Sequence, residues 1–163
     1  MFVVKEFPRA SELNFLLYDI VCENLSGDVK DGVYGDGGGD IITEYELHNQ
    51  KIKEIDELTS WISRVLPDVS KNFATKEKPR VGVQSHEDKQ NYDFDVNSFE
   101  IQSCWGIHYS GKESLYAHNH FPALLSFIYY VRTPKGSAPI MVGDELHNVE
   151  EGQCIFFLAS QFH

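Results

Sequence analysis

The stretch QSCWGIHYSGKESLYAHNHFPALLSFIYYVR, residues 102–132, decides the fold, because its apolar runs are short and are broken by Gly, Asn and Pro. The same texture begins after residue 98 and continues to residue 163. Short apolar runs separated by turn residues are typical of antiparallel strands in a sandwich or barrel. We therefore predict strands in four runs: 99–109, 123–132, 140–142 and 153–159.

Upstream of this β-core the sequence predicts helices. Residues 1–7 alternate enough for an edge strand, and Ser11 reads as the N-cap of a first helix. A second helix is predicted over about residues 49–69. Both helices carry an apolar stripe at helical spacing: Leu13, Leu16, Leu17, Ile20, Val21 and Leu25 in the first, and Ile52, Ile55, Leu58, Ile62, Val65 and Leu66 in the second.

Two polar segments interrupt this pattern. Residues 27–40 are rich in Gly and Asp and read as a loop, and residues 70–97 read as a loop with one short strand at 80–84. The chain is therefore predicted as a single α+β domain over residues 1–163. Residues 1–97 form its helical and strand support region, and residues 98–163 form the β-core that carries the chemistry.

Composition excludes several classes of protein. The chain has 163 residues, 42% of them hydrophobic, and a net charge of −11. That charge argues against nucleic acid as a partner, because phosphate binding needs clustered Lys and Arg. No apolar run is long enough for a membrane span, and the N-terminus lacks the pattern of a signal peptide. Three widely spaced cysteines predict free thiols in a reducing cytoplasm.

Histidines mark the candidate site. On a strand, alternate side chains share a face, so Tyr116, His118 and His120 would point the same way. Two imidazoles at this spacing can hold one metal ion, although a pair of surface histidines near a turn is the alternative. His163 follows a predicted buried strand and would complete a facial triad, which leaves coordination positions open for substrate and oxygen. We therefore expect a metal site made by His118, His120 and His163.

The same residues resemble the 2-oxoglutarate- and Fe(II)-dependent oxygenases, in particular the prolyl 4-hydroxylase-like branch. In that family a first metal-bearing strand commonly reads Tyr, a Gly-containing turn, then Tyr-x-His-x-Asp. That order is matched here by five residues: Tyr109, Gly111, Tyr116, His118 and His120. The distal histidine of the family follows paired aromatics and a Ser- or Pro-containing turn, to which Phe156-Phe157, Ser160 and His163 are similar.

The resemblance covers roughly residues 99–163 and implies a double-stranded β-helix, or jelly roll, with flanking N-terminal helices. It further implies Fe(II) on the three histidines and 2-oxoglutarate as co-substrate, so that the enzyme hydroxylates a substrate with O2. Tyr130, the second residue of a Tyr-Tyr pair, is the residue implied for the carboxylate of 2-oxoglutarate, together with Tyr109. Tyr116 is a further cofactor-site residue, because it would share a strand face with the histidines.

Two departures from the family pattern qualify the resemblance. His120 stands where the family has a carboxylate ligand, and Asp144 and Glu145, the alternative source of a carboxylate, read as turn residues. The family continues beyond the distal histidine with a strand whose Arg or Lys pairs with 2-oxoglutarate, so we expect a truncated reading frame or a fragment. Arg132 shares strand parity with Tyr130 and can stand in for that residue, the alternative being a charge at a strand end.

Two other functions remain open at this point. A cupin-like metalloprotein would keep the histidines and use no 2-oxoglutarate, and a non-catalytic jelly-roll domain for binding or assembly would hold no metal. The substrate is expected to be a small molecule or a peptide. An incomplete jelly roll would leave an unpaired sheet edge, through which the chain could form a homodimer.

Overall fold

A computed structural model describes residues 1–26, 33–34, 41–73, 99–109, 111 and 114–163. It has two α-helices and small antiparallel sheets, which confirms the predicted α+β class. Along the chain the elements are β1 (Phe2–Glu6), α1 (Ala10–Glu23), β2 (Val33–Tyr34), the 3-10 helix η1 (Leu47–Asn49), α2 (Lys53–Ser70), β3 (Ser114–Leu115), β4 (Leu125–Tyr129), β5 (Ile140–Val142), β6 (Glu145–His147) and β7 (Gln153–Leu158).

The main sheet has three antiparallel strands in the order β1-β7-β4. Its central strand, β7, is fully buried from Cys154 to Phe157, as expected for an apolar run with a neighbour on each side. Cys154 and Phe156 belong to one core cluster, and Ile155 and Phe157 belong to another. Because alternate side chains of a strand face opposite ways, β7 separates the two clusters.

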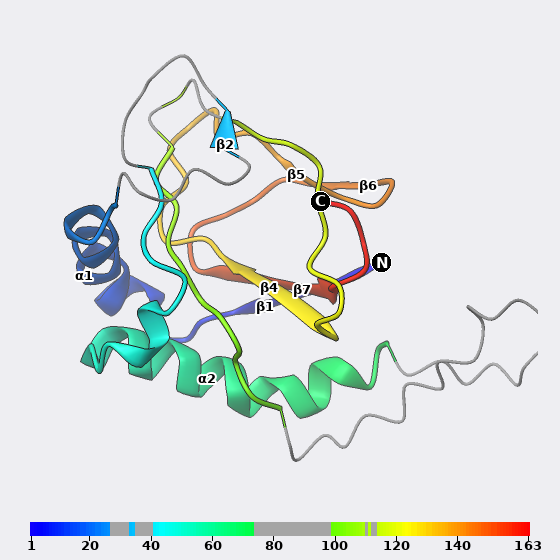
Figure 1. Cartoon of the computed structure of the whole chain (residues 1–163), viewed down its shortest axis with the longest axis horizontal. Coiled ribbons are helices and arrows are strands. Elements are labelled where there is room, and N and C mark those ends of the chain that lie inside the picture. The colour runs from blue at the N-terminus through cyan, green and yellow to red at the C-terminus, as the bar shows by residue number, and fades with distance from the viewer. Residues whose placement is uncertain (27–32, 35–40, 74–98, 110, 112–113) are drawn as a thin grey trace, which may run out of the picture.

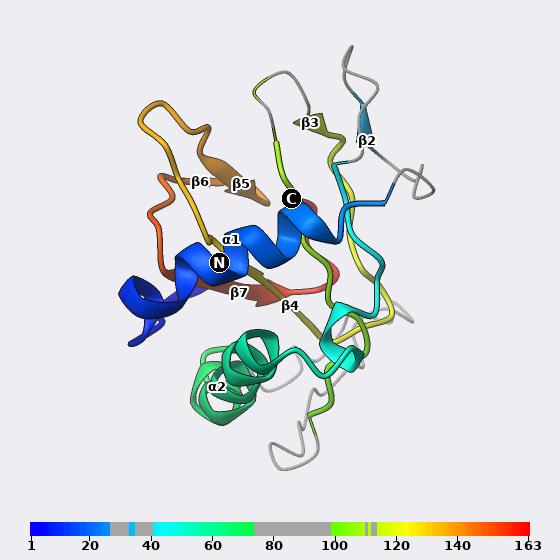
Figure 2. The ribbon, with the colours of Figure 1, turned by 90° about the vertical axis from the view of Figure 1, so that its left-hand side faces the viewer.

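Helices cover one face of this sheet, and the β5–β6 hairpin lies on the other (Figure 1). Apolar residues of α1 and α2 pack against Phe156 in the larger cluster, and α1 runs across the molecule beside the sheet, as Figure 2 shows. Val142 of β5 packs against Ile155 and Phe157 in the smaller cluster. The C-terminal segment that follows β7 rises on the hairpin side (Figure 1).

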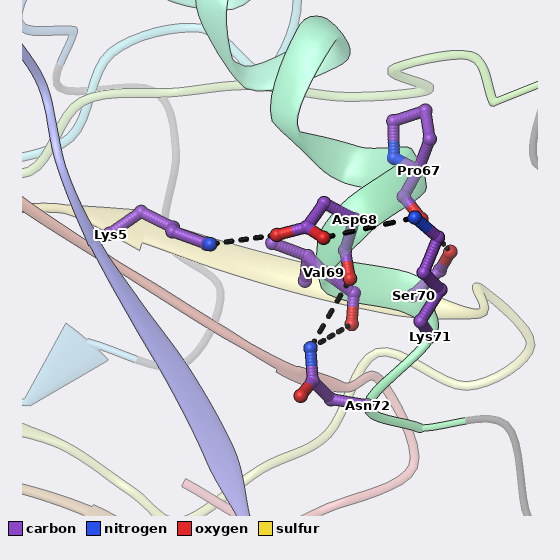
Figure 3. A network of polar contacts seen from close by, with 7 residues as sticks. All are labelled: Lys5, Pro67, Asp68, Val69, Ser70, Lys71 and Asn72. Carbon is purple, nitrogen blue, oxygen red and sulfur yellow. Dashed lines mark hydrogen bonds and ion pairs between the residues drawn. The ribbon is translucent and has the colours of Figure 1, made fainter.

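Helix α2 is amphipathic, and polar contacts fix its C-terminal end (Figure 3). Asp68 accepts a hydrogen bond of 2.9 Å from Lys5 of β1, which joins the helix to the sheet. The side-chain amide of Asn72 donates to the carbonyl oxygens of Asp68 and Val69 in the last turn of the helix, and its backbone N–H also donates to Val69. The ion pair is exposed, so the apolar face of α2 supplies most of the stabilisation of this contact.

Several predicted boundaries are wrong, and the reason is local. Helix α1 begins at Ala10 with Arg9 as its N-cap and no side-chain capping bond, so Ser11 is not the cap. Arg9 instead pairs with Glu12 and with Glu57 of α2, an interaction that fixes the start of the helix from outside. Helix α2 begins at Lys53 rather than near residue 49, because η1 occupies the preceding turn.

The predicted strands divide into three groups. β4, β5 and β7 lie within or at the predicted runs, and β1 is the edge strand expected at the N-terminus. Residues 99–109 form no strand and make only isolated bridges, Ile42 with Ile107 and Glu46 with Cys104. The sequence did not indicate β6, nor β2 inside the predicted loop. The strand expected at 80–84 lies outside the described residues, as does most of the loop at 27–40.

Candidate metal centre

Backbone hydrogen bonds hold His118 and His120 beside His163, in the segment that follows β7. His118 and His163 exchange a reciprocal pair, with N···O distances of 3.2 and 3.1 Å. The His120 N–H donates to the carbonyl of Ala159 at 2.8 Å, and the Ala159 N–H donates to the carbonyl of Leu124 at 3.1 Å. The segment that carries His118 and His120 therefore lies alongside the segment that carries His163.

The prediction that His118 and His120 lie on a strand is wrong. β3 stops at Leu115, and residues 116–120 have no strand assignment. Their partner, the stretch after Leu158, contains a turn, so a regular ladder cannot form between the two segments. His118 and His120 nevertheless both remain beside the C-terminal segment, because each forms backbone hydrogen bonds with it.

The three imidazoles converge. One ligand nitrogen from each of His118, His120 and His163 lies within 4.8 Å of the others. Their ring centroids are 4.9 Å apart for the first pair, 4.5 Å for His118 with His163, and 5.1 Å for His120 with His163. Nitrogens that share one ion through bonds of ~2.1 Å lie roughly 3 Å apart when adjacent. A movement of about 1 Å by each ring would therefore let all three bind the same ion.

Two of the rings are held in the tautomer that a metal ligand needs. Nδ1 of His118 donates to the carbonyl of Tyr116 at 2.9 Å, and Nδ1 of His163 donates to the carbonyl of Gln161 at 3.3 Å. A carbonyl oxygen can only accept, so each Nδ1 carries the hydrogen and each Nε2 keeps its lone pair. This second hydrogen bond is how proteins orient metal-binding histidines.

Aromatic side chains surround the triad. The Trp105 ring lies 5.5 Å from the His120 ring, and the Phe157 ring lies 4.6 Å from the His163 ring. Trp105 in turn contacts Tyr45 edge-to-face at 5.1 Å. Nothing in the sequence distinguishes Trp105 or Phe157 as a site residue, because an aromatic residue in an apolar run is most often part of the core.

The surroundings favour neutral imidazoles. Burial lowers the pKa of His163 to about 4, with smaller effects in the same direction from His118 and His120, and the hydrogen bond to Gln161 opposes them. Burial, followed by the charge of His118, also lowers the pKa of His120. A metal ion binds the neutral imidazole, so the site fits a divalent cation better than it fits three protons.

The other predicted site residues lie at different distances from the triad. Tyr116 supplies the carbonyl that orients His118, and its side chain is 65% exposed. Tyr130 packs in the same apolar cluster as Phe157, which contacts His163. Burial, and then the neighbouring Tyr109, raise the pKa of Tyr130 above its usual range. Tyr109 is therefore near Tyr130, and its own side chain is 45% exposed.

Arg132 is not brought to the triad. Its guanidinium carbon lies 4.8 Å from the centre of the Tyr18 ring on α1. The antiparallel register places Ser126 opposite Phe157, so Arg132 lies six residues along the chain from the level of the triad. The structure thus separates Arg132 from the histidines, although strand parity had grouped it with Tyr130.

The carboxylates of the β5–β6 hairpin, Asp144 and Glu145, are also not part of the triad. Among the described residues the only group of three or more His, Cys, Asp or Glu side chains that could hold a metal is His118, His120 and His163. Glu145 is engaged elsewhere, since it forms an ion pair of 2.8 Å with the amino group of Met1. Asp144 lies in the turn as predicted, but Glu145 does not, because it is the first residue of β6.

Comparisons with known proteins do not place the chain in a family. No protein-family model matches it, and neither a curated protein nor a solved structure is similar to it. Within the described residues, no helix combines the length and the apolar character that crossing a membrane requires. The described cysteines, Cys22, Cys104 and Cys154, are all free thiols.

Proposed function

We propose that this protein is a non-haem Fe(II) oxygenase that takes 2-oxoglutarate as co-substrate. The observation that carries the proposal is the convergence of His118, His120 and His163, with two Nδ1 atoms fixed by backbone carbonyls. Three nitrogen ligands on one side of an ion leave further coordination positions for a chelating co-substrate and for oxygen. Bound Fe(II) supplies the redox chemistry by which O2 is used to oxidise an unreactive carbon.

The protein's own residues have separate roles in this proposal. His118, His120 and His163 hold the metal, while Trp105 and Phe157 exclude water from two sides of the triad. Tyr130, with Tyr109 beside it, donates a hydrogen bond to the far carboxylate of 2-oxoglutarate. A tyrosine whose pKa is raised by burial stays protonated at neutral pH and can act as this donor.

The proposal extends to the fold and the setting. We propose that the described sheets belong to a jelly roll, since the hairpin faces the main sheet across a common apolar cluster. The free thiols and the acidic composition suit a cytoplasmic enzyme. The substrate is a small molecule or a peptide, with no role for nucleic acid or a membrane, and a homodimer can form through the edges of the main sheet.

One observation favours a second candidate, a cupin-like metalloenzyme without 2-oxoglutarate. Arg132, the expected partner of the far carboxylate, stacks on Tyr18 instead. Without a nearby cation, the binding of 2-oxoglutarate depends on the metal and the tyrosines alone.

An anaerobic titration separates these functions. Fe(II) is added to the protein with 2-oxoglutarate present, and the charge-transfer absorbance of the chelate is recorded. The oxygenase proposal predicts the band in the wild type and in His147→Ala, which changes a histidine outside the triad. It predicts no band in His118→Ala and a weaker affinity for 2-oxoglutarate in Tyr130→Phe. Metal binding without the band would support the cupin-like candidate, and no metal binding would leave only the non-catalytic one.

A further inference from the structure

A second polar cluster lies where three segments that are distant in sequence meet. Tyr18 of α1 contacts Arg132, which follows β4, and His108, which lies in the irregular segment 99–109. The arginine lies against the face of the tyrosine ring, with 4.8 Å from its guanidinium carbon to the ring centre. The His108 ring meets the same tyrosine edge-to-face at 5.6 Å.

The face of α1 explains why these residues meet. Asn14 and Tyr18 are four residues apart and therefore lie one above the other on the helix. Asn14 accepts a hydrogen bond of 2.5 Å from the hydroxyl of Tyr129 at the end of β4. One helical turn later, the Tyr18 ring stacks against the guanidinium of Arg132. Tyr18 is half-buried between the two segments, so its ring is a fixed platform rather than a mobile surface side chain.

The third segment is held equally closely. A Cβ built on Gly106 would lie 2.6 Å from a methyl carbon of Val21, so only glycine allows this approach of segment 99–109 to α1. Gly106 and His108 are two residues apart in this irregular segment, and both lie against the helix. The backbone N–H of His108 also donates to the carbonyl of Ile41 at 2.8 Å, which fixes the position of the histidine.

Arg132 is exposed, and its guanidinium stacks on Tyr18 without being neutralised by a carboxylate of the described residues. No Asp or Glu of the described residues lies within ion-pair distance of its guanidinium, whereas Arg9 is paired with two carboxylates. Stacking on an aromatic ring holds a guanidinium in place and leaves its N–H groups directed outward in one plane. The Tyr18 hydroxyl lies 3.5 Å from Nε2 of His108, at the limit of a hydrogen bond, so both atoms can turn to an additional ligand.

We propose that Arg132, Tyr18 and His108 form a binding site for a carboxylate group, separate from the histidine triad. A planar carboxylate accepts two parallel hydrogen bonds from a guanidinium, and a tyrosine hydroxyl and an imidazole N–H can complete its shell. The single cation of the cluster matches one negative charge. Phosphate sites, by contrast, commonly combine a helix N-terminus with further cations.

The ligand of this site is not one that is bound at the triad. Arg132 lies six residues along the chain from Ser126, which the register places opposite Phe157, and its guanidinium stacks on Tyr18 of α1. Phe157, which contacts His163, belongs to the buried cluster on the hairpin side of the sheet, whereas Arg132 and His108 contact Tyr18 of α1. The proposal of a carboxylate site therefore does not depend on the proposed oxygenase function.

The test uses the metal-free 163-residue protein and two small probes, N-acetylglycine and its uncharged analogue N-acetylglycinamide. Backbone amide shifts in ¹H–¹⁵N spectra are followed during each titration. The proposal predicts saturable shifts at His108 and Arg132 with N-acetylglycine and none with the amide. It predicts at least about tenfold weaker binding in Arg132→Gln, with a smaller loss in Arg132→Lys, which keeps the charge but not the planar fork.

The matched control is Arg64→Gln, which removes an exposed arginine of α2 that also has no carboxylate partner in the described part of the chain. Its affinity for N-acetylglycine should equal that of the wild type. Equal binding of acid and amide, or unchanged binding in Arg132→Gln, would overturn the proposal. Tighter binding of inorganic phosphate than of N-acetylglycine would overturn the assignment to a carboxylate.

Discussion

Two neighbouring phenylalanines of β7 offer a test of how the core supports the triad. Phe156 and Phe157 are both fully buried, but they face opposite sides of the sheet. Phe157 contacts the His163 ring at 4.6 Å, whereas Phe156 packs among the helices. Replacing either by leucine removes a similar apolar volume. Only one of the two replacements leaves a gap beside a ligand.

The expected losses follow from this geometry. Because both side chains are fully buried, Phe156→Leu and Phe157→Leu should each lower the free energy of unfolding by about 1–2 kcal/mol. Loss of a group that orients a ligand commonly weakens metal binding by about 10- to 100-fold. The contact to His163 is apolar rather than a hydrogen bond, so we expect the lower end, about tenfold, for Phe157→Leu alone.

Two assays on each variant give the answer. Urea unfolding of the metal-free protein measures the change in stability, and a Co(II) titration at neutral pH measures the affinity of the triad. The reasoning predicts similar losses of stability and a loss of affinity only in Phe157→Leu. Equal loss of affinity in both variants would refute it, since the effect would then follow from general destabilisation.

Three further predictions concern other parts of the chain. Burial lowers the pKa of His163 from 6.5 to about 4. Between these pH values the unfolded chain binds a proton at this histidine and the folded chain does not. The free energy of unfolding of the metal-free protein should therefore fall by about 1–2 kcal/mol, after allowance for solvent screening, as the pH drops from 6.5 to 4. Urea unfolding at several pH values should show that the free energy of unfolding depends less on pH in His163→Asn than in the wild type. An equal pH dependence would contradict the assignment of this effect to His163. Gly152 has φ +88° and a Cβ there would lie 2.8 Å from the Cβ of Ala10, so Gly152→Ala should destabilise the fold by about 1–3 kcal/mol in thermal or urea unfolding, and a loss below a few tenths would show that the turn adapts. Burial raises the pKa of Cys104 to about 11, so mass spectrometry should find this thiol unmodified by iodoacetamide at pH 8 until urea unfolds the chain, and rapid labelling of the native protein would contradict its burial.

Patterns that depend on local sequence were predicted well. The continuous apolar run of β7 indicated a central buried strand, and the structure gives it as Gln153–Leu158. The apolar stripe of α2 indicated its buried face, from which Ile55, Leu58 and Ile62 enter the core. The three candidate ligands were also chosen from sequence, and the structure brings them within 4.8 Å of one another.

Features that depend on distant contacts were not predictable in this way. Residues 118–120 lie against the turn after β7, so their backbone does not have the strand geometry that the spacing of His118 and His120 suggested. Trp105 lies beside His120 through the packing of segment 99–109, for which the sequence has no local signal. Arg132 follows the helix face at Tyr18, which strand parity could not indicate.

The central claim is that His118, His120 and His163 hold one metal ion, and metal stoichiometry after equilibrium dialysis tests it most directly. The protein is dialysed anaerobically against Fe(II), and in parallel against Co(II), and bound metal is counted by elemental analysis. The account predicts one ion per chain in the wild type and in His147→Ala, and none in His118→Ala or His163→Ala. Retention of the ion by the two triad variants, or its absence from the wild type, would contradict the account.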